Sequence, residues 1–406
     1  MIALWLLGCV APPDTACEEL SAALGACTGV PDLPVPCDAL TPGDVDALVE
    51  AVDLLGCGAL QGILPLDGDP LAASCALLGE GCVDSPVPAL PSGPPTRYPL
   101  VLVNGIDVSP LFSWSERIVG VLRAQGHTVE LAVVPPYDAT PARSAVLWQR
   151  VEQIREQTGA PRVNLLCHSL GGLDCRYLVS PNGLRWDLPA DGDRMADAVA
   201  SITTVSTAHR GTPVADVALG FVSGADPKDG LDRLATALGS WLTQDAVDHD
   251  VQLRAALGAL TESQAQAFSA SIVDADGVYY QSWAGFSRPW GAPGADDPAR
   301  LAEACATDDG DGLALDVTAE EDHLPVTLLD SWSLVAELAA EGEAEAPNDG
   351  LCPVRSARWG RFRGCVPADH MEQLGRGGIP DANVRTRVDI AAFYAAVARD
   401  LARQGF

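Results

Sequence analysis

The stretch Val163-Asn164-Leu165-Leu166-Cys167-His168-Ser169-Leu170-Gly171-Gly172 decides how the chain is understood. An apolar run ends in a turn of small residues with Ser169 at its tip, and a helix-compatible segment, Leu173 to Leu178, follows. This order predicts a nucleophile elbow, whose strained turn lifts the serine hydroxyl out of the sheet towards free N–H groups at the helix N-terminus. Gly171 supplies the small residue needed after the serine, whereas Cys167 stands where Gly is expected before it.

A motif this short is weak evidence by itself, because a serine at such a turn also caps ordinary helices. The surrounding chain supplies context, since buried runs alternate with amphipathic segments. The expected strands are Tyr98–Val103, Thr128–Val134, Arg162–Leu166 and Val199–Val205, and the expected helices are Ser115–Gln125, Pro141–Gln157 and, at the C-terminus, Val384–Gln404. The alternation predicts an α/β fold, with a parallel sheet covered by helices on both faces.

Residues 98–406 are therefore predicted to form one α/β domain. Between about 213 and 345 the rhythm changes, and helix-like segments such as Gly230–Thr243 and Asp250–Leu260 alternate with acidic and Gly-rich loops. Within that region Val278–Gly285 still has the pattern of a core strand. The simplest interpretation is a cap or lid over the active-site end of the sheet, and the alternative is helices with no role there.

The charge and the cysteine content of the chain argue against some binding partners and indicate the redox state of its compartment. The formal net charge is −30 and Lys228 is the single lysine in 406 residues, which argues against binding nucleic acid or an anionic membrane surface. Twelve cysteines are too many for an ordinary cytosolic enzyme and indicate an oxidising compartment.

Residues 1–97 are predicted to be separate from the α/β domain and to include an export signal. Residues 1–9 look like the tail of a bacterial lipoprotein signal, in which Cys9 would be lipidated and attach the product to a membrane. No basic segment precedes it, so either the true start lies upstream or the signal is imperfect. We therefore expect an exported product, either an outer-membrane or cell-surface lipoprotein or a secreted protein.

Residues 10–83 are predicted to form a small helical domain stapled by three disulfides, and residues 84–97 a stiff Pro-rich linker. The cysteines of this domain are Cys17, Cys27, Cys37, Cys57, Cys75 and Cys82. A spacer and a docking module are equally open as its role, and its partner is unknown.

A nucleophilic serine needs a base and a group that orients the base. After a nucleophile elbow, the acid is expected to follow the serine in the chain and the histidine to follow the acid. The turn Pro347-Asn348-Asp349-Gly350 can present a carboxylate, and His370 is the only histidine after it. We expect Ser169 to attack an ester carbonyl, His370 to relay its proton and Asp349 to hold the imidazole, with His370 at the end of a loop, Phe362–Asp369. The alternatives are an ordinary turn aspartate and a surface histidine.

An oxyanion hole would need two N–H donors near Ser169. The Leu170 amide follows the nucleophile directly, and the Ile106 amide lies in the loop after the first core strand. We predict these two amides as the donors.

Five motifs in order over residues 97–406 resemble those of bacterial true lipases of the Pseudomonas and Burkholderia type. They are Tyr98–Ile106, Val163–Gly172, Thr203–Gly211, Pro347–Leu351 and Asp369–Glu372. The resemblance implies an α/β-hydrolase fold with a lid and hydrolysis of triacylglycerols. It also implies a structural calcium ion that braces the histidine loop.

The resemblance places the calcium carboxylates at Asp330 and Glu372, with backbone carbonyls near Arg376 and Pro380. Glu372 stands where the family has Asp and reaches further, and the alternative is two solvated carboxylates. Other departures from the family lie at the elbow, the oxyanion loop and the segment after the fourth strand. They are Asn104 for His, Cys167 for Gly, Leu170 for a bracing Gln and Ala208 for Pro.

The remaining cysteines and histidines carry their own expectations. We expect a Cys352–Cys365 disulfide that would partly replace the bracing by calcium if the ion is lost, with Cys305–Cys352 as the competing pair. Cys167 and Cys175 are expected as buried thiols. His168 should be structural, and His209 with Arg210 should tie the core strand to the cap, although a role in the substrate pocket is open.

The sequence thus favours a secreted or surface-attached lipase acting on lipid or other ester substrates. A short-chain or polyester esterase is the alternative within hydrolases. A non-catalytic surface lipoprotein on a hydrolase fold is the alternative outside them, and the complete Ser169, Asp349 and His370 set speaks against it.

Overall fold

A computed structural model describes most of the chain from residue 93 onward. The described residues are 93–108, 112–184, 195–222, 228, 249–287, 298–308, 326–339, 345–375 and 388–406. The predicted signal with Cys9, the Cys-rich domain, most of the linker, helix Gly230–Thr243 and the stretch around Arg376 and Pro380 lie outside them. Contacts divide the chain into two units, and the larger, Asp84–Gly377 with Asp381–Phe406, contains every element described below.

The core of this unit is a parallel sheet in the order β2-β1-β3-β4-β5-β6. Its described strands are β1 (Leu100–Val103), β2 (Val129–Ala132), β3 (Val163–His168), β4 (Val199–Val205), β5 (Tyr279–Phe286) and β6 (Arg361–Pro367). Every residue of β1, β3 and β4 is buried, as expected for central strands covered on both faces. The carboxyl ends of β1, β3 and β4 lie at one edge, where the elbow follows β3.

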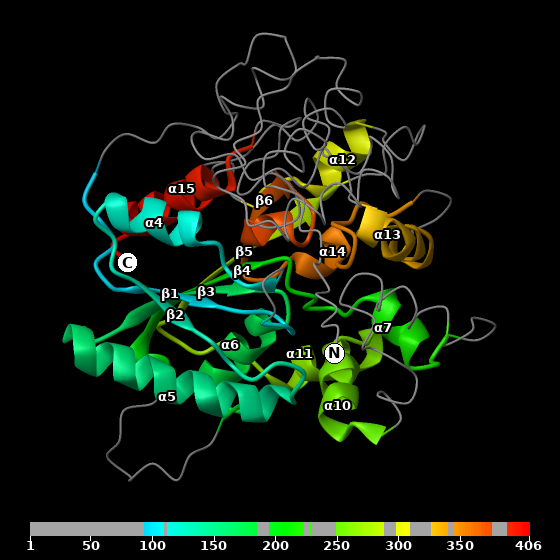
Figure 1. Ribbon diagram of the computed structural model, residues 1–406, viewed down its shortest axis with the longest axis horizontal. Coiled ribbons are helices and arrows are strands. Elements are labelled where there is room, and N and C mark those ends of the chain that lie inside the picture. Colours follow the sequence, from blue (N-terminus) through cyan, green and yellow to red (C-terminus); the bar gives the residue numbers. More distant parts are fainter. Residues whose placement is uncertain are drawn as a thin grey trace, which may run out of the picture. The chain divides into compact units, whose positions relative to one another are not determined.

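Two pairs of helices cover the sheet, one on each face (Figure 1). The helices α4 (Glu116–Ala124) and α15 (Ile390–Arg403) cover one face, and α5 (Thr140–Thr158) and α6 (Gly171–Val179) the other. The hydroxyl of Ser115 caps α4 and the carboxylate of Asp389 caps α15, each by accepting a backbone N–H of the first turn. The predicted α/β architecture is confirmed.

Further helices complete the described part. They are α7 (Pro213–Ala218), α10 (Val251–Ala259), α11 (Glu262–Ser271), α12 (Pro298–Ala304), α13 (Val326–Leu338), α14 (Val354–Ala357) and the 3-10 turns Met195–Ala198 and Glu372–Leu374. The predictions of a helix at Asp250–Leu260 and a core strand at Val278–Gly285 are confirmed by α10 and β5. No helix among the described residues is long and apolar enough to cross a membrane.

The predicted loop Phe362–Asp369 is wrong, because Arg361–Pro367 forms strand β6. Two arginines and Gly364 conceal this strand in the sequence. Arg363 is nevertheless buried, since its guanidinium pairs with the Asp400 carboxylate of α15 at 2.9 Å. A charge that is neutralised across the fold can therefore occupy a core strand.

The predicted cysteine pairs are also wrong. Cys305 bonds to Cys365 of β6, Cys167 bonds to Cys175, and Cys352 is a buried free thiol. Cys305 follows α12 directly, and its Cα lies 5.3 Å from that of Cys365, so this pair leaves Cys352 without a partner cysteine among the described residues. A Cys352–Cys365 bond that replaces the bracing by calcium is thereby excluded.

Candidate active site

Ser169 has the backbone of a nucleophile at a strained turn. Its φ is +53°, in the left-handed region that non-glycine residues seldom adopt. Its N–H donates to the Val205 carbonyl of β4 at 3.0 Å, and its carbonyl accepts the Thr207 hydroxyl at 2.8 Å. A side chain at position 171 would place its Cβ 2.4 Å from the Asn104 carbonyl oxygen, so only Gly171 fits there. The predicted elbow is confirmed as a structural feature.

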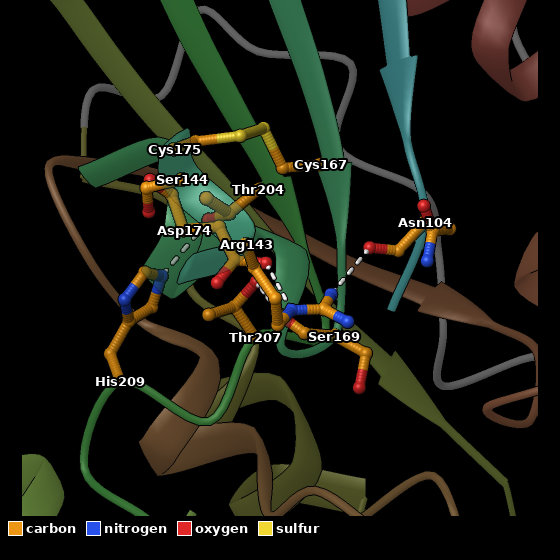
Figure 2. Close-up of a disulfide and its surroundings, with 10 residues drawn as sticks. All are labelled: Asn104, Arg143, Ser144, Cys167, Ser169, Asp174, Cys175, Thr204, Thr207 and His209. Carbon is orange, nitrogen blue, oxygen red and sulfur yellow. Dashed lines mark hydrogen bonds and ion pairs between the residues drawn. A yellow bond between two sulfur atoms is a disulfide. The ribbon is translucent and has the colours of Figure 1, made fainter. Parts of the chain in front are cut away.

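A cross-link explains why Cys167 stands where glycine was expected. It stands near the end of β3, two residues before Ser169, and bonds to Cys175 in the middle of α6. Figure 2 shows this disulfide joining the strand before the serine to the helix after it. The elbow is therefore closed into a small covalent ring.

The structure brings Asp349 and His370 together. His370 follows β6 and Asp349 lies in the turn before α14, and His370 Nδ1 is 2.8 Å from Asp349 Oδ2. The other carboxylate oxygen accepts the backbone N–H groups of Leu351 and Cys352, at 3.1 and 2.7 Å. Burial by itself would raise the pKa of Asp349, but His370 and these hydrogen bonds lower it to about 2. Asp349 is thus held as an anion.

Ser169 and His370 line the same cavity, which also contains the predicted oxyanion residue Ile106. Helices α7 and α10, from the predicted cap region, contribute to its walls. Its apolar lining includes Phe112, Val214, Ala215, Leu257, Leu260 and Leu351. Such a cavity suits an acyl chain better than a polar substrate.

The amides of Ile106 and Leu170 are available as oxyanion donors. Among the described residues neither donates to a protein acceptor. The Gly105 carbonyl oxygen accepts from Arg143 Nη2 at 2.6 Å and from Asn104 Nδ2 at 2.9 Å. Because the peptide is planar and trans, holding this oxygen aims the Ile106 N–H in the opposite direction.

Arg143 of α5 therefore braces the oxyanion loop, a role that was not predicted from the sequence. Its guanidinium also pairs with Asp174 of α6 at 2.8 Å, and both side chains are fully buried (Figure 2). Burial raises the pKa of Asp174 to about 6 in spite of this pairing. One signal of this role was present in the sequence: Arg143 stands four residues before Leu147 and therefore lies on the same, buried face of the helix. Arg143 supplies the bracing that Leu170 lacks.

His209 holds neighbouring elements together, as predicted. Its Nε2 lies 3.0 Å from the Thr204 hydroxyl of β4, and its carbonyl accepts the Ser269 hydroxyl of α11 at 3.0 Å. Burial, and then the charge of Arg176, lower the His209 pKa well below the ordinary value. The Arg210 side chain is exposed, and its backbone N–H donates to the Ser356 hydroxyl.

The described residues do not assemble a calcium site. Asp330 lies in α13, but its side chain is outside the described part, as are the predicted carbonyl ligands. Glu372 Oε2 accepts the backbone N–H of Asp369 at 3.0 Å. In the part of the chain that is described, no group of three or more His, Cys, Asp or Glu could hold a metal ion. The calcium ion stays a prediction.

Comparison with known proteins shows what this chain is similar to. No family model matches it. A triacylglycerol lipase from Vibrio cholerae is 29% identical over 210 residues, which cover 47% of this chain and 63% of that protein. One from Burkholderia plantarii is 29% identical over 195 residues, covering 44% and 49%. The chain is related to bacterial triacylglycerol lipases.

The chain spans less than two thirds of either lipase. Among solved structures, lipase 1 from Pelosinus fermentans is 16% identical, with a TM-score of 0.48 and coverage of 75% of this chain and 98% of that one. The parallel sheet, with the elbow after its third strand in the sequence, has the arrangement of an α/β-hydrolase fold.

Proposed function

We propose that the protein is a carboxylic ester hydrolase of the lipase type, with Ser169 as nucleophile, His370 as base and Asp349 as orienting acid. One observation supports this most strongly. A serine at φ +53° and a histidine bonded to a buried, ionised aspartate line one apolar cavity. A binding protein would gain nothing from keeping all three.

The geometry supports acyl transfer in two steps. Asp349 Oδ2 accepts the Nδ1 proton of His370, which leaves Nε2 free to take the proton of Ser169 as its oxygen attacks the ester carbonyl. The amides of Ile106 and Leu170 stabilise the oxyanion, and losing one such donor costs about 3 kcal/mol of barrier. His370 then protonates the leaving alcohol, and water hydrolyses the acyl-enzyme by the same route.

The substrate is proposed to be a long-chain ester such as a triacylglycerol. The apolar lining of the cavity supports this choice, because it can bury an acyl chain while Ser169 and His370 face the ester group. The relatives named as triacylglycerol lipases agree with it.

We place the protein outside the cytoplasm. Disulfides Cys167–Cys175 and Cys305–Cys365 need an oxidising compartment to form and persist. Attachment through lipidated Cys9 and bracing by calcium at Asp330 and Glu372 are separate proposals. Labelling with a radioactive fatty acid tests the first, and loss of activity in a chelator, restored by calcium, tests the second.

The test is hydrolysis of p-nitrophenyl esters from acetate to palmitate by the full chain. Ser169→Ala should lower kcat roughly 10⁵-fold, while the matched control Ser271→Ala, an exposed serine at the end of α11, should not change it. Turnover that rises towards palmitate supports a lipase, and turnover confined to acetate and butyrate supports a short-chain esterase instead. Folded protein without Ser169-dependent turnover refutes the proposal.

A further inference from the structure

Gln373 lies against the acid of the site. It stands in the 3-10 turn Glu372–Leu374, three residues after His370, and is 1% exposed. Its Nε2 donates to Asp349 Oδ2 at 3.0 Å, which is the same oxygen that faces His370 Nδ1 at 2.8 Å. One carboxylate oxygen therefore takes a hydrogen bond from the histidine and another from the glutamine.

The orientation of the Gln373 amide follows from its partners. Besides Asp349, its Nε2 donates to the Ala368 carbonyl at 3.2 Å, and both of these partners are acceptors only. The NH2 group must face them, so Oε1 faces His168 Nε2 at 3.3 Å. A carbonyl-type oxygen requires a proton on that nitrogen, which assigns His168 to the Nε2–H tautomer.

The surroundings hold Gln373 in place. The Tyr394 hydroxyl of α15 donates to the Gln373 backbone carbonyl at 2.9 Å, and the Gln373 backbone N–H donates to the Asp369 carbonyl. A Cβ at Gly285 would lie 1.8 Å from Gln373 Nε2 and 2.9 Å from Asp349 Cβ, so β5 leaves space for the contact by carrying glycine.

His168 completes the arrangement as a neutral donor. It is buried at the end of β3, and its ring centroid lies 4.6 Å from that of His370. Burial, followed by the charge of His370, keeps the His168 pKa well below its ordinary value. Gln373 thus links the residue before the nucleophile to the acid that orients the base.

We infer that Gln373 is a positioning residue for the reaction. Its side-chain N–H holds Asp349 Oδ2 in line with His370 Nδ1, while its Oε1 accepts from His168 Nε2. The inference rests on the proposed function, because it assigns Gln373 a task in the same acyl transfer. Neither residue touches the substrate.

The test compares Gln373→Met with the wild type in the full chain. Met fills nearly the same space as Gln but cannot donate a hydrogen bond to Asp349. The substitution should lower kcat for a p-nitrophenyl ester by about 10- to 100-fold with little change in KM, because a donor to a buried anion is lost. Gln281→Met serves as the control, since Gln281 of β5 is equally buried and bonds to the Thr203 hydroxyl.

A second measurement needs no substrate. In ¹⁵N-histidine-labelled protein, His168 should show the Nε2–H tautomer in the wild type and the Gln281→Met control, and a mixture of tautomers in Gln373→Met. Wild-type kcat per folded molecule in Gln373→Met, or an unchanged His168 tautomer, overturns the inference. If the wild type hydrolyses no ester, the proposed function fails, while the spectrum still reports on the link between His168 and Gln373.

Discussion

The two halves of the candidate site are held in different ways. The nucleophile half, around Ser169 and the Ile106 amide, is fixed by elements of the sheet and its helices, through the Cys167–Cys175 disulfide and the buried Arg143–Asp174 pair. The acid–base half consists of two turns, joined by hydrogen bonds that converge on one carboxylate, Asp349. The first half depends on tertiary packing, and the second on the charge of a single group.

One buried aspartate in each half shows how differently the two halves treat a carboxylate. Asp174 and Asp349 are both fully buried. Asp349 accepts N–H groups on both oxygens and its pKa falls to about 2, whereas Asp174 Oδ1 has no partner among the described residues and its pKa rises to about 6. Burial raises the pKa of both carboxylates; the interaction with His370 and the hydrogen bonds outweigh burial at Asp349, whereas Arg143 does not outweigh it at Asp174.

The largest losses of kcat should come from replacing one supporting side chain in each half, Asp349 in the acid–base half and Arg143 in the nucleophile half. Asp349→Asn should lower kcat about 10⁴-fold, because the histidine loses its orienting anion. Arg143→Met should lower it less, about 10- to 100-fold, since the Ile106 amide is misaimed but not removed. Kinetics per folded molecule measure both, with Arg150→Met, an exposed arginine on the same helix, as control. An equal loss in both variants would contradict the division into halves.

Removing each disulfide in turn should affect stability and activity differently. The Cys305–Cys365 bond closes 60 residues and the Cys167–Cys175 bond closes 8. From chain entropy, replacing the first pair by alanine should cost about 4 kcal/mol of unfolding free energy and the second about 2.5 kcal/mol. Only the second should lower kcat of the folded protein, because it lies beside Ser169. Denaturant titration and kinetics measure these, and a larger stability loss for the short ring would refute the order.

The smallest effect is the pH dependence of stability. The pKa of Asp349 falls from 3.8 to about 2 on folding, so its stabilisation is present above pH 3.8 and is lost as the pH falls towards 2. The pKa of Asp174 rises from 3.8 to about 6, so its stabilisation is present below pH 3.8 and is lost as the pH rises towards 6.

The free energy of unfolding of the wild type, measured against pH relative to Asp349→Asn and to Asp174→Asn, should therefore change in opposite directions for the two comparisons. The advantage of the wild type over Asp349→Asn should shrink below pH 3.8, and its stability relative to Asp174→Asn should decline between pH 3.8 and 6. Parallel curves for both variants would show that the two carboxylates share one kind of environment.

Much of the fold could be predicted because its features are local. The apolar run before Ser169, the small residues after it and the alternation of buried and amphipathic segments specify strand, turn and helix over short stretches. Strand β6 was missed because the charge of Arg363 hides it, and that charge is neutralised by Asp400, 37 residues away along the chain. The cysteine pairs were wrong for the same reason, since spacing does not show which Cα atoms come within reach.

The available chemistry could be recognised in the sequence: a serine on a turn, and an aspartate and a histidine after it in the order of this fold. The contacts that support these three residues could be seen only in the folded chain. Arg143 reaches Asp174 over 31 positions and His168 reaches Gln373 over 205. Such pairs have no local pattern, because they exist only once the sheet has brought distant segments together and burial has made each unmet hydrogen bond costly.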